Sequence, residues 1–449
     1  MGVKNRYHYW NGSACHPIAV GLVTLFLLFN LWGCSTKKVD QLNLMPAPDV
    51  YDEGVIDPFT ETDPIENIPY GGMLYATDRK PDSQAERRTY LSERGGLVRL
   101  GVAKTEVGDQ EITWEEARRI SLLKNRTAKY PLKVTAFDEF GILGRSFSVF
   151  TDPKMIPADP SQPARHFSEQ VNAKLHRSTR KDIYVYVHGY KVVFENPILV
   201  ASELWHFLGY DGVFVAYSWP STPRTLAYAS DLETAAVSSS HFRIFLEYLA
   251  AETDAEQIHI VGYSAGTRVV LNTLGQMALL NDDKTKQQIQ EKLRIGNVIL
   301  VGSDFDRFLF GTLVAEGLLK VPKTLSIYQS GTDKALGFSR WLFGRERLGQ
   351  TATDRQLDPI VAEFLWANED LILIDVTGAA AAGSDNGHAY FRKSPWVSSD
   401  ILVSLLHEVA PADRGLVRGP TSPVWFFPED YIERLRATLK QARAEKLTE

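Results

Sequence analysis

Cysteine is almost absent from this chain. Of 449 residues only Cys15 and Cys34 are cysteines, and both lie near the N-terminus. The rest of the chain therefore cannot form an internal disulfide, a cysteine-ligated metal site or a cysteine nucleophile. The H-E-x-x-H, Walker A and Rossmann glycine motifs are absent too, so nothing in the sequence calls for a metal or a nucleotide. We expect neither a cofactor nor a metal ion.

Long runs of basic residues are also missing. The formal net charge is −6, hydrophobic residues make up 44% and charged residues 23%. These proportions are ordinary for a globular protein, and a mildly acidic body argues against nucleic acid as the main partner. The length allows a large core with appendages. The sequence does not indicate an oligomeric state.

One long apolar run is present, at residues 18–29, and Lys4 and Arg6 precede it. It suits the core of a signal peptide and is short of the ~20 residues that a spanning helix needs. The segment that follows, Leu31-Trp32-Gly33-Cys34, resembles the lipobox of bacterial lipoproteins, although Trp32 stands where a small residue is usual.

This resemblance implies a signal peptide over residues 1–34 and lipidation of Cys34. It also implies a body outside the cytoplasm, held at a membrane of the cell envelope by its lipid anchor. Ser35 in place of an aspartate implies the outer membrane. The alternative is an uncleaved N-terminal anchor in which Cys34 has no role.

Residues 35–69 carry repeated prolines and acids and hold no apolar period. We predict an extended, proline-rich tether between the anchor and the body. The alternative is a strap that packs along the surface of the domain. The domain itself is expected over residues 70–449.

Short apolar runs alternate with helical patterns along the domain. Continuous apolar strands of this kind indicate a mostly parallel sheet with helices on both faces, an α/β fold. Ligands bind at the carboxyl ends of the strands in such sheets. The expected strands are residues 72–77, 97–103, 132–137, 183–187, 213–218, 258–262, 298–301, 325–329 and 371–375, and the expected helices are 114–123, 164–176, 197–208, 227–251, 267–280, 399–408 and 429–445.

The strongest motif is Gly262-Tyr263-Ser264-Ala265-Gly266, which matches G-x-S-x-G. It stands between an expected strand and an expected helix, as a nucleophile elbow requires. A sharp turn would strain Ser264 and raise its hydroxyl into the cleft, and the glycines would let strand and helix approach closely. The alternative is a glycine-rich turn with an idle serine.

A nucleophilic serine needs a histidine base and an acid that orients it. Only His388 and His407 follow Ser264 in the chain, and the order in this fold is serine, acid, histidine. We choose His388, which lies in a glycine-rich loop after strand 371–375, because His407 falls inside a helical pattern.

Three aspartates compete to be the acid. Asp333 follows strand 325–329, whereas Asp304 and Asp306 follow the preceding strand. We choose Asp333, since a loop after the later strand lies closer to the histidine loop. The alternative role for Asp333 is a turn or a helix cap before residue 334.

The oxyanion hole is expected where strand 183–187 ends. We assign its two backbone N–H donors to Tyr190 and to Ala265, the residue after the nucleophile. His188 is expected to be structural. Trp219 could line an acyl pocket, although packing in the core is the favoured role.

Several segments together resemble a bacterial α/β-hydrolase family of unknown function, often met as predicted lipoproteins. The resemblance implies the triad Ser264, Asp333 and His388 and no particular substrate. The matching segments are LYATDR (74–79), YVHGY (186–190), YSWPS (217–221), GYSAG (262–266), SGTDKAL (330–336) and GHAYF (387–391).

We therefore expect a serine hydrolase that cleaves carboxylic esters, of small molecules or of lipids, through an acyl-enzyme. The alternatives are an envelope acyltransferase with the same triad and a non-catalytic binding module on a hydrolase fold. Residues 337–366 are an insertion with an apolar cluster at 341–343. This insertion could be a cap over acyl groups, a lipid-contacting segment or a packed surface excursion.

Overall fold

The computed structural model describes residues 42–54, 56–85, 89–108, 112–224, 227–337, 346–351, 359–384 and 387–446. The expected signal peptide, Cys34 and residues 35–41 lie outside the described residues, as do residues 338–345 and 352–358 of the insertion. Within the described part, no helix combines the length and the hydropathy needed to cross a membrane.

An eleven-stranded sheet organises the described residues, in the order β10-β11-β9-β8-β7-β6-β4-β5-β1-β2-β3. The strands from β11 to β1 in that order run parallel, and β10, β2 and β3 are antiparallel to their neighbours. Their bounds are β1 Met73–Pro81, β2 Tyr90–Val107, β3 Leu132–Ile142, β4 Asp182–Val187, β5 Val213–Ser218, β6 Gln257–Tyr263, β7 Ile295–Val301, β8 Thr324–Gln329, β9 Leu371–Asp375, β10 Val417–Arg418 and β11 Trp425–Phe426.

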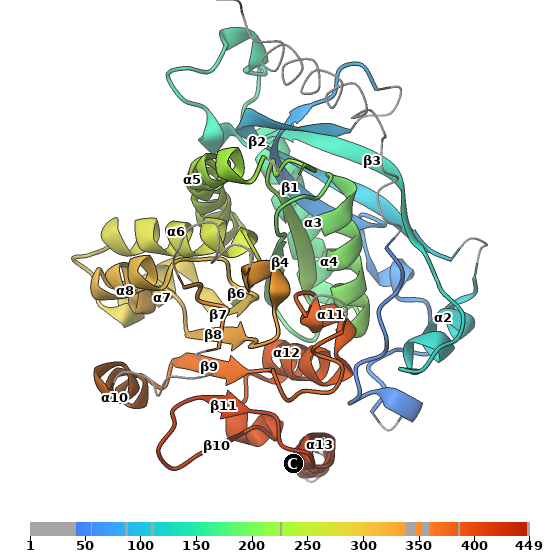
Figure 1. Ribbon diagram of the computed structural model, residues 1–449. Coiled ribbons are helices and arrows are strands. Elements are labelled where there is room, and N and C mark those ends of the chain that lie inside the picture. Colours follow the sequence, from blue (N-terminus) through green and yellow to red (C-terminus); the bar gives the residue numbers. More distant parts are fainter. Residues whose placement is uncertain are drawn as a thin grey trace, which may run out of the picture. The chain divides into compact units, whose positions relative to one another are not determined.

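Helices pack on both faces of this sheet, and Figure 1 shows α5 and α6 on one side of the central strands and α4 and α12 on the other. The helices are α2 Trp114–Ser121, α3 Gln162–Arg177, α4 Glu195–Phe207, α5 Tyr228–Glu252, α6 Gly266–Leu279, α7 Lys286–Leu293, α8 Arg307–Ala315, α10 Pro359–Ala367, α11 Tyr390–Lys393, α12 Pro395–His407 and α13 Tyr431–Lys446.

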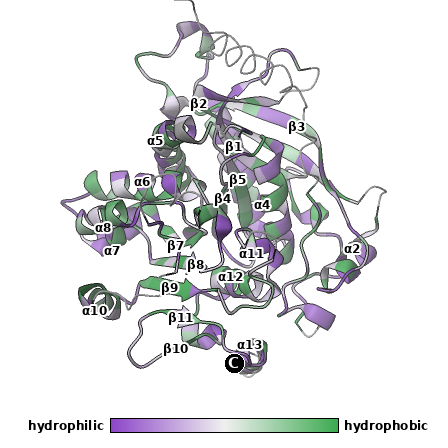
Figure 2. Cartoon of the chain, in the orientation of Figure 1, coloured by the Kyte–Doolittle hydropathy of each residue, from purple (hydrophilic) through white to green (hydrophobic). Residues whose placement is uncertain are grey.

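The side chains of each central strand divide between two cores. In β4, Ile183, Val185 and Val187 join the core formed with α3, α5 and α6. Tyr184 and Tyr186 join the core formed with α4 and α12. This period of two buries both faces of the strand, which explains the unbroken apolar run in its sequence. Figure 2 shows hydrophobic residues along β5 and α4 and more hydrophilic ones along the edge strand β3. The expected fold class is confirmed.

Residues 42–69, expected as part of a tether, lie on the domain in the manner of the strap alternative. Met45 and Val50 are buried. The Met45 N–H donates to Glu203 on α4 over 2.6 Å, and the Val50 N–H donates to Ser399 on α12 over 3.0 Å. The apolar residues between the prolines therefore have a packing role that the proline pattern concealed.

Several element boundaries differ from those expected, and some short elements were not expected at all. Strand β2 begins at Tyr90 rather than at residue 97, because its first half pairs with β1 although residues 91–96 remain partly or fully exposed. Helix α4 begins at Glu195, so Pro197 is not its first residue. Helices α7, α8, α10 and α11 and the two-residue strands β10 and β11 were not expected. Most of them are too short to show a clear period.

Candidate active site

Ser264 lies in the sharp turn between β6, which ends at Tyr263, and α6, which begins at Gly266. Its φ is +52°, a left-handed value that costs free energy for a residue with a side chain. Hydrogen bonds hold this conformation: the Ser264 N–H donates to Val301 O over 2.9 Å, and the Thr267 hydroxyl donates to Ser264 O over 2.6 Å. This is the strained turn that the motif requires.

The two glycines of the motif lie where a side chain would collide. A Cβ on Gly266 would stand 2.2 Å from His188 O, and one on Gly262 would stand 3.0 Å from the Val270 side chain. Glycine at 262 therefore lets β6 and α6 approach closely, as the sequence predicted, and glycine at 266 also lets α6 begin directly against the end of β4.

The structure brings Ser264, His388 and Asp333 together from three separate loops. His388 Nε2 lies 2.9 Å from Ser264 Oγ, and His388 Nδ1 lies 2.6 Å from Asp333 Oδ2. All three residues are buried, at 8%, 9% and 5% exposure. A carboxylate can only accept, so Nδ1 carries the hydrogen and Nε2 presents its lone pair to the serine hydroxyl.

Asp333 fills both roles considered for it, the acid that orients His388 and the cap of the turn that follows. Its Oδ2 meets His388, and its Oδ1 accepts the Leu336 N–H over 3.0 Å, which caps the turn that follows.

The other residues that competed for the roles of acid and base are engaged elsewhere. Asp304 lies 3.4 Å from each of two arginines, Arg268 and Arg347. Asp306 accepts the N–H groups of the first turn of α8, and His407 is exposed at the end of α12.

Residues beneath the imidazole were not predicted from the sequence. Gly302 has a φ of +55°, and a Cβ there would stand 3.1 Å from His388 Cε1. The Gly302 N–H donates to the Tyr390 hydroxyl over 2.6 Å, and that hydroxyl donates to Tyr328 O over 2.8 Å. Burial raises the pKa of Tyr390 well above 10, so its hydroxyl remains a donor. Two features of the sequence could have pointed to these residues: Tyr390 lies in segment 387–391, and Gly302 directly follows a strand.

The loop after β4 passes directly beside the serine. A Cβ on Gly189 would stand 2.9 Å from Ser264 Cβ and 3.4 Å from its Oγ, so the expected donor Tyr190 is the next residue along. Ala265 is the N-cap of α6, and backbone N–H groups at a helix start have no partner within the helix. Both expected oxyanion donors thus belong to segments that adjoin Ser264.

His188 and Trp219 form a buried stacked pair behind this loop. Their ring centroids lie 5.4 Å apart at an interplanar angle of 11°. Trp219 Nε1–H donates to His188 O over 2.6 Å, and the His188 ring contacts the carbonyls of Gly189 and Trp219. Burial, aided by the Arg79 charge, lowers the pKa of His188 well below 6.5. Trp219 is fully buried, so it packs in the core as favoured and does not line an open pocket.

One described stretch of the insertion, residues 346–351, packs beside this region. The Leu348 N–H donates to Phe305 O and the Gly349 N–H donates to Ser303 O, while the Ser330 N–H donates to Gly349 O. Residues 348–349 therefore bind the loops after β7 and β8. The expected apolar cluster at 341–343 lies outside the described residues.

One cluster among the described residues has the composition of a metal site. Asp182, His259 and Glu408 bring ligand atoms within 4.8 Å of one another at the opposite end of β4. However, His259 Nδ1 accepts the Asn297 N–H over 3.0 Å. In a neutral imidazole the hydrogen then resides on Nε2, so the ring offers no lone pair to a metal ion.

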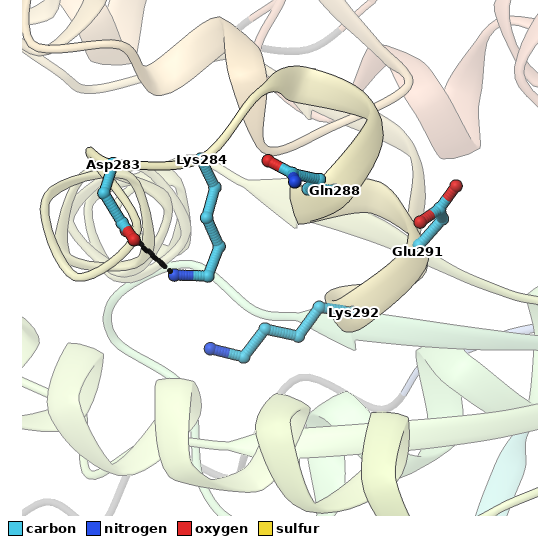
Figure 3. Close-up of a pocket in the computed structure, with 5 residues that line it drawn as sticks. All are labelled: Asp283, Lys284, Gln288, Glu291 and Lys292. Carbon is cyan, nitrogen blue, oxygen red and sulfur yellow. Dashed lines mark hydrogen bonds and ion pairs between the residues drawn. The ribbon is translucent and has the colours of Figure 1, made fainter.

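A hollow of about 520 Å³ lies between the end of α6 and α7. Figure 3 shows the five polar side chains that line it, Asp283, Lys284, Gln288, Glu291 and Lys292. None of them belongs to the group around Ser264. We therefore do not regard this hollow as part of the candidate active site.

Comparison with known proteins agrees with the fold. Residues 164–405 match the model of a family described as "alpha/beta hydrolase of unknown function (DUF900)". Searches of curated proteins and of solved structures gave no match. The matched region covers more than half of the chain and includes Ser264, Asp333 and His388. The chain therefore belongs to this family of alpha/beta hydrolases of unknown function.

Proposed function

We propose that this protein is a serine hydrolase that cleaves carboxylic esters through an acyl-enzyme. The observation that carries the proposal is the continuous chain of contacts from Asp333 through His388 to Ser264, 2.6 Å and 2.9 Å long, at a strained strand–helix turn. Nucleophile, base and orienting acid in this relation are the minimal set for acyl transfer.

In the first half-reaction, Ser264 Oγ attacks the ester carbonyl carbon while His388 Nε2 takes the hydroxyl proton. Asp333 stabilises the resulting imidazolium through its contact with Nδ1. The negative charge that develops on the carbonyl oxygen is stabilised by the backbone N–H groups of Tyr190 and Ala265. The tetrahedral intermediate collapses, and His388 returns the proton to the departing alcohol.

In the second half-reaction, a water molecule gives its proton to His388 Nε2 and attacks the acyl-enzyme. The second tetrahedral intermediate collapses to the free acid, and the proton returns to Ser264 Oγ. Each cycle consumes one ester and one water and releases one acid and one alcohol. The steps balance with these residues, the ester and water.

We further propose that the protein is held at the cell envelope by a lipid on Cys34. The support is the sequence of residues 18–34, which has the order expected of a lipoprotein signal. The substrates would then be esters available at that membrane.

Pre-steady-state hydrolysis of a p-nitrophenyl ester tests the proposed chemistry. With the purified full-length chain we expect a burst of p-nitrophenol of about one equivalent, since such an activated ester acylates the serine faster than water releases the acyl group. Ser264→Ala should remove the burst and lower kcat by about 10⁶-fold. Turnover that persists in Ser264→Ala would contradict the proposal.

A further inference from the structure

The segment 74–79 (LYATDR) has no part in the mechanism above, yet it ends beside the candidate active site. Its last residues lie at the carboxyl end of β1, where Thr77 pairs with Ser218 of the parallel strand β5. The Thr77 hydroxyl donates to Ser218 O over 2.6 Å. This end of the sheet is also the end at which β4 and β6 lead into Gly189 and Ser264.

Arg79 is fully buried, and its guanidinium has only neutral partners. Nε donates to Ser218 Oγ over 3.0 Å, Nη1 to Ser92 Oγ over 3.3 Å and Nη2 to Val192 O over 3.1 Å. Among the described residues no carboxylate forms an ion pair with it. A buried charge without a paired carboxylate costs free energy, so the burial of Arg79 calls for a role.

The carboxylate of Asp78, the residue before Arg79, contacts α5 and not the guanidinium. Asp78 Oδ2 accepts the Ser238 hydroxyl over 2.6 Å and contacts His241 Nδ1 at 3.1 Å, both on α5. Burial lowers the pKa of Arg79 to about 10, and the charges of Asp78, Glu195 and Asp231 partly oppose this. The guanidinium therefore remains positive near pH 7.

The contact with Val192 connects this charge to the oxyanion loop, residues 189–192. Gly189 lies against Ser264 at one end of the loop, and Val192 lies against Arg79 at the other. Lys191, between them, has a left-handed φ of +68°, which is costly for a lysine. A loop with such a residue keeps its shape only if its ends are fixed.

A second side chain fixes the same end of the loop. The Ser221 hydroxyl donates to Val192 O over 3.2 Å, and the Val192 N–H approaches Ser221 Oγ at 3.4 Å. Arg79 and Ser221 thus hold one carbonyl from two sides. The field of Arg79 also reaches the loop, because it contributes to the lowered pKa of His188.

We propose that Arg79 is a positioning residue for the oxyanion hole: it holds residues 189–192 through Val192 O, so that the Tyr190 N–H meets the tetrahedral intermediate. Its positive charge also favours the oxyanion electrostatically. This inference rests on the proposed serine-hydrolase function.

The test compares Arg79→Met, Arg79→Lys and Ser221→Ala with the full-length wild type. We expect kcat to fall by about 10- to 100-fold in Arg79→Met, less than the 10²–10³ for a lost oxyanion donor, and less again in Arg79→Lys, which keeps the charge. KM should stay within about threefold, because the donor acts mainly in the transition state. The affinity for a trifluoromethyl ketone, whose adduct carries an oxyanion, should fall by the same factor as kcat.

Ser221→Ala removes the other hydrogen bond to Val192 O and introduces no larger side chain. If Arg79→Met does not fold, the kcat and ketone affinity of Ser221→Ala therefore test the inference. Ser146→Ala is the matched control, because Ser146 also holds a loop: its hydroxyl accepts the Val98 N–H of β2 and donates to Leu143 O, just after β3. Its kcat should match the wild type.

Unchanged kcat and ketone affinity in the folded Arg79 variants and in Ser221→Ala would overturn the inference. An equal fall in Ser146→Ala would overturn it too, because the loss would then reflect general destabilisation. In either case an active wild type would leave the proposed function standing. A folded wild type that shows no ester turnover would instead remove the proposed function.

Discussion

His388 Nδ1 lies 2.6 Å from Asp333 Oδ2, while Asp333 Oδ1 accepts the Leu336 N–H. In Asp333→Asn the amide oxygen can keep the bond to Leu336, which turns the amide NH₂ towards His388. The imidazole would then accept at Nδ1 and carry its hydrogen on Nε2, facing Ser264. We expect kcat for ester hydrolysis to fall by about 10⁴-fold, with little change in the urea midpoint.

The matched control for this variant is Asp306→Asn. Asp306 also caps a helix with its carboxylate, at the start of α8, and has no part in the proposed mechanism. We expect it to keep the wild-type kcat and nearly the wild-type stability, because asparagine caps a helix about as well as aspartate. Equal activity losses in the two variants would argue against a specific role of Asp333.

Gly302 should tolerate no side chain, because a Cβ there would stand 3.1 Å from His388 Cε1 at a φ of +55°. We expect Gly302→Ala to push the imidazole away from Ser264 by a few tenths of an ångström and to lower kcat by about 10-fold, less than the 10²-fold that a misplacement of about 1 Å can cost. Gly317→Ala is the control, since Gly317 has a φ of +94° and meets only the flexible Lys320 side chain. Its backbone cost should be similar, at about 1 kcal/mol, with full activity. If both variants kept full activity, the packing of Gly302 against His388 would not matter to function.

Stability should fall on acidification because of buried neutral histidines. Burial lowers the pKa of His206 to about 3 from 6.5. The unfolded chain therefore binds more protons than the folded one between those values. Burial of the neutral imidazole of His206 therefore leaves the free energy of unfolding undiminished above pH 6.5. It lowers that free energy progressively as the pH falls from 6.5 towards 3. At pH 5 the loss is roughly 2 kcal/mol for His206 alone.

Urea unfolding at pH 8 and pH 5 measures this contribution. His206→Gln can keep contacts to Ser121 and Tyr210, which the ring of His206 now meets. We expect the variant to be less stable than the wild type at pH 8 but to lose about 2 kcal/mol less on transfer to pH 5. An identical loss in both proteins would show that His206 does not titrate in this way.

Lipid attachment is predicted at Cys34 and not at Cys15. Radiolabelled palmitate should be incorporated by the wild type and by Cys15→Ser when each is expressed in a bacterial host, and Cys34→Ser should incorporate none. The mature N-terminus of the wild type should begin at Cys34. Label in Cys34→Ser would contradict lipid attachment at Cys34, and an unlabelled wild type with an intact residue 1 would favour the uncleaved anchor.

The central strands and their motifs could be predicted because local and tertiary signals agree there. Strand β4 is buried on both faces, so its apolar run marks it unambiguously. The turn at Ser264 needs glycines at both flanks for steric reasons, which makes the motif visible. The order serine, acid, histidine then limited the partners to a few residues, and the structure places the chosen three in contact.

Other features depend on contacts between distant segments and leave no local pattern. Met45 and Val50 look like tether residues until α4 and α12 cover them. Gly302 gains its role only because His388, far along the chain, lies against it. Arg79 looks like a surface arginine, since nothing near it in sequence reveals that Val192 and Ser218 bury it.

The most direct test of the account is covalent labelling of the full-length chain with a fluorophosphonate probe, followed by mass spectrometry of its peptides. An activated serine reacts with this phosphorus electrophile, whereas an ordinary serine does not. We predict one adduct, on Ser264, that is lost in Ser264→Ala and after denaturation and is much slower to form in His388→Ala. A folded chain that remains unlabelled, or an adduct on another residue, would contradict the account.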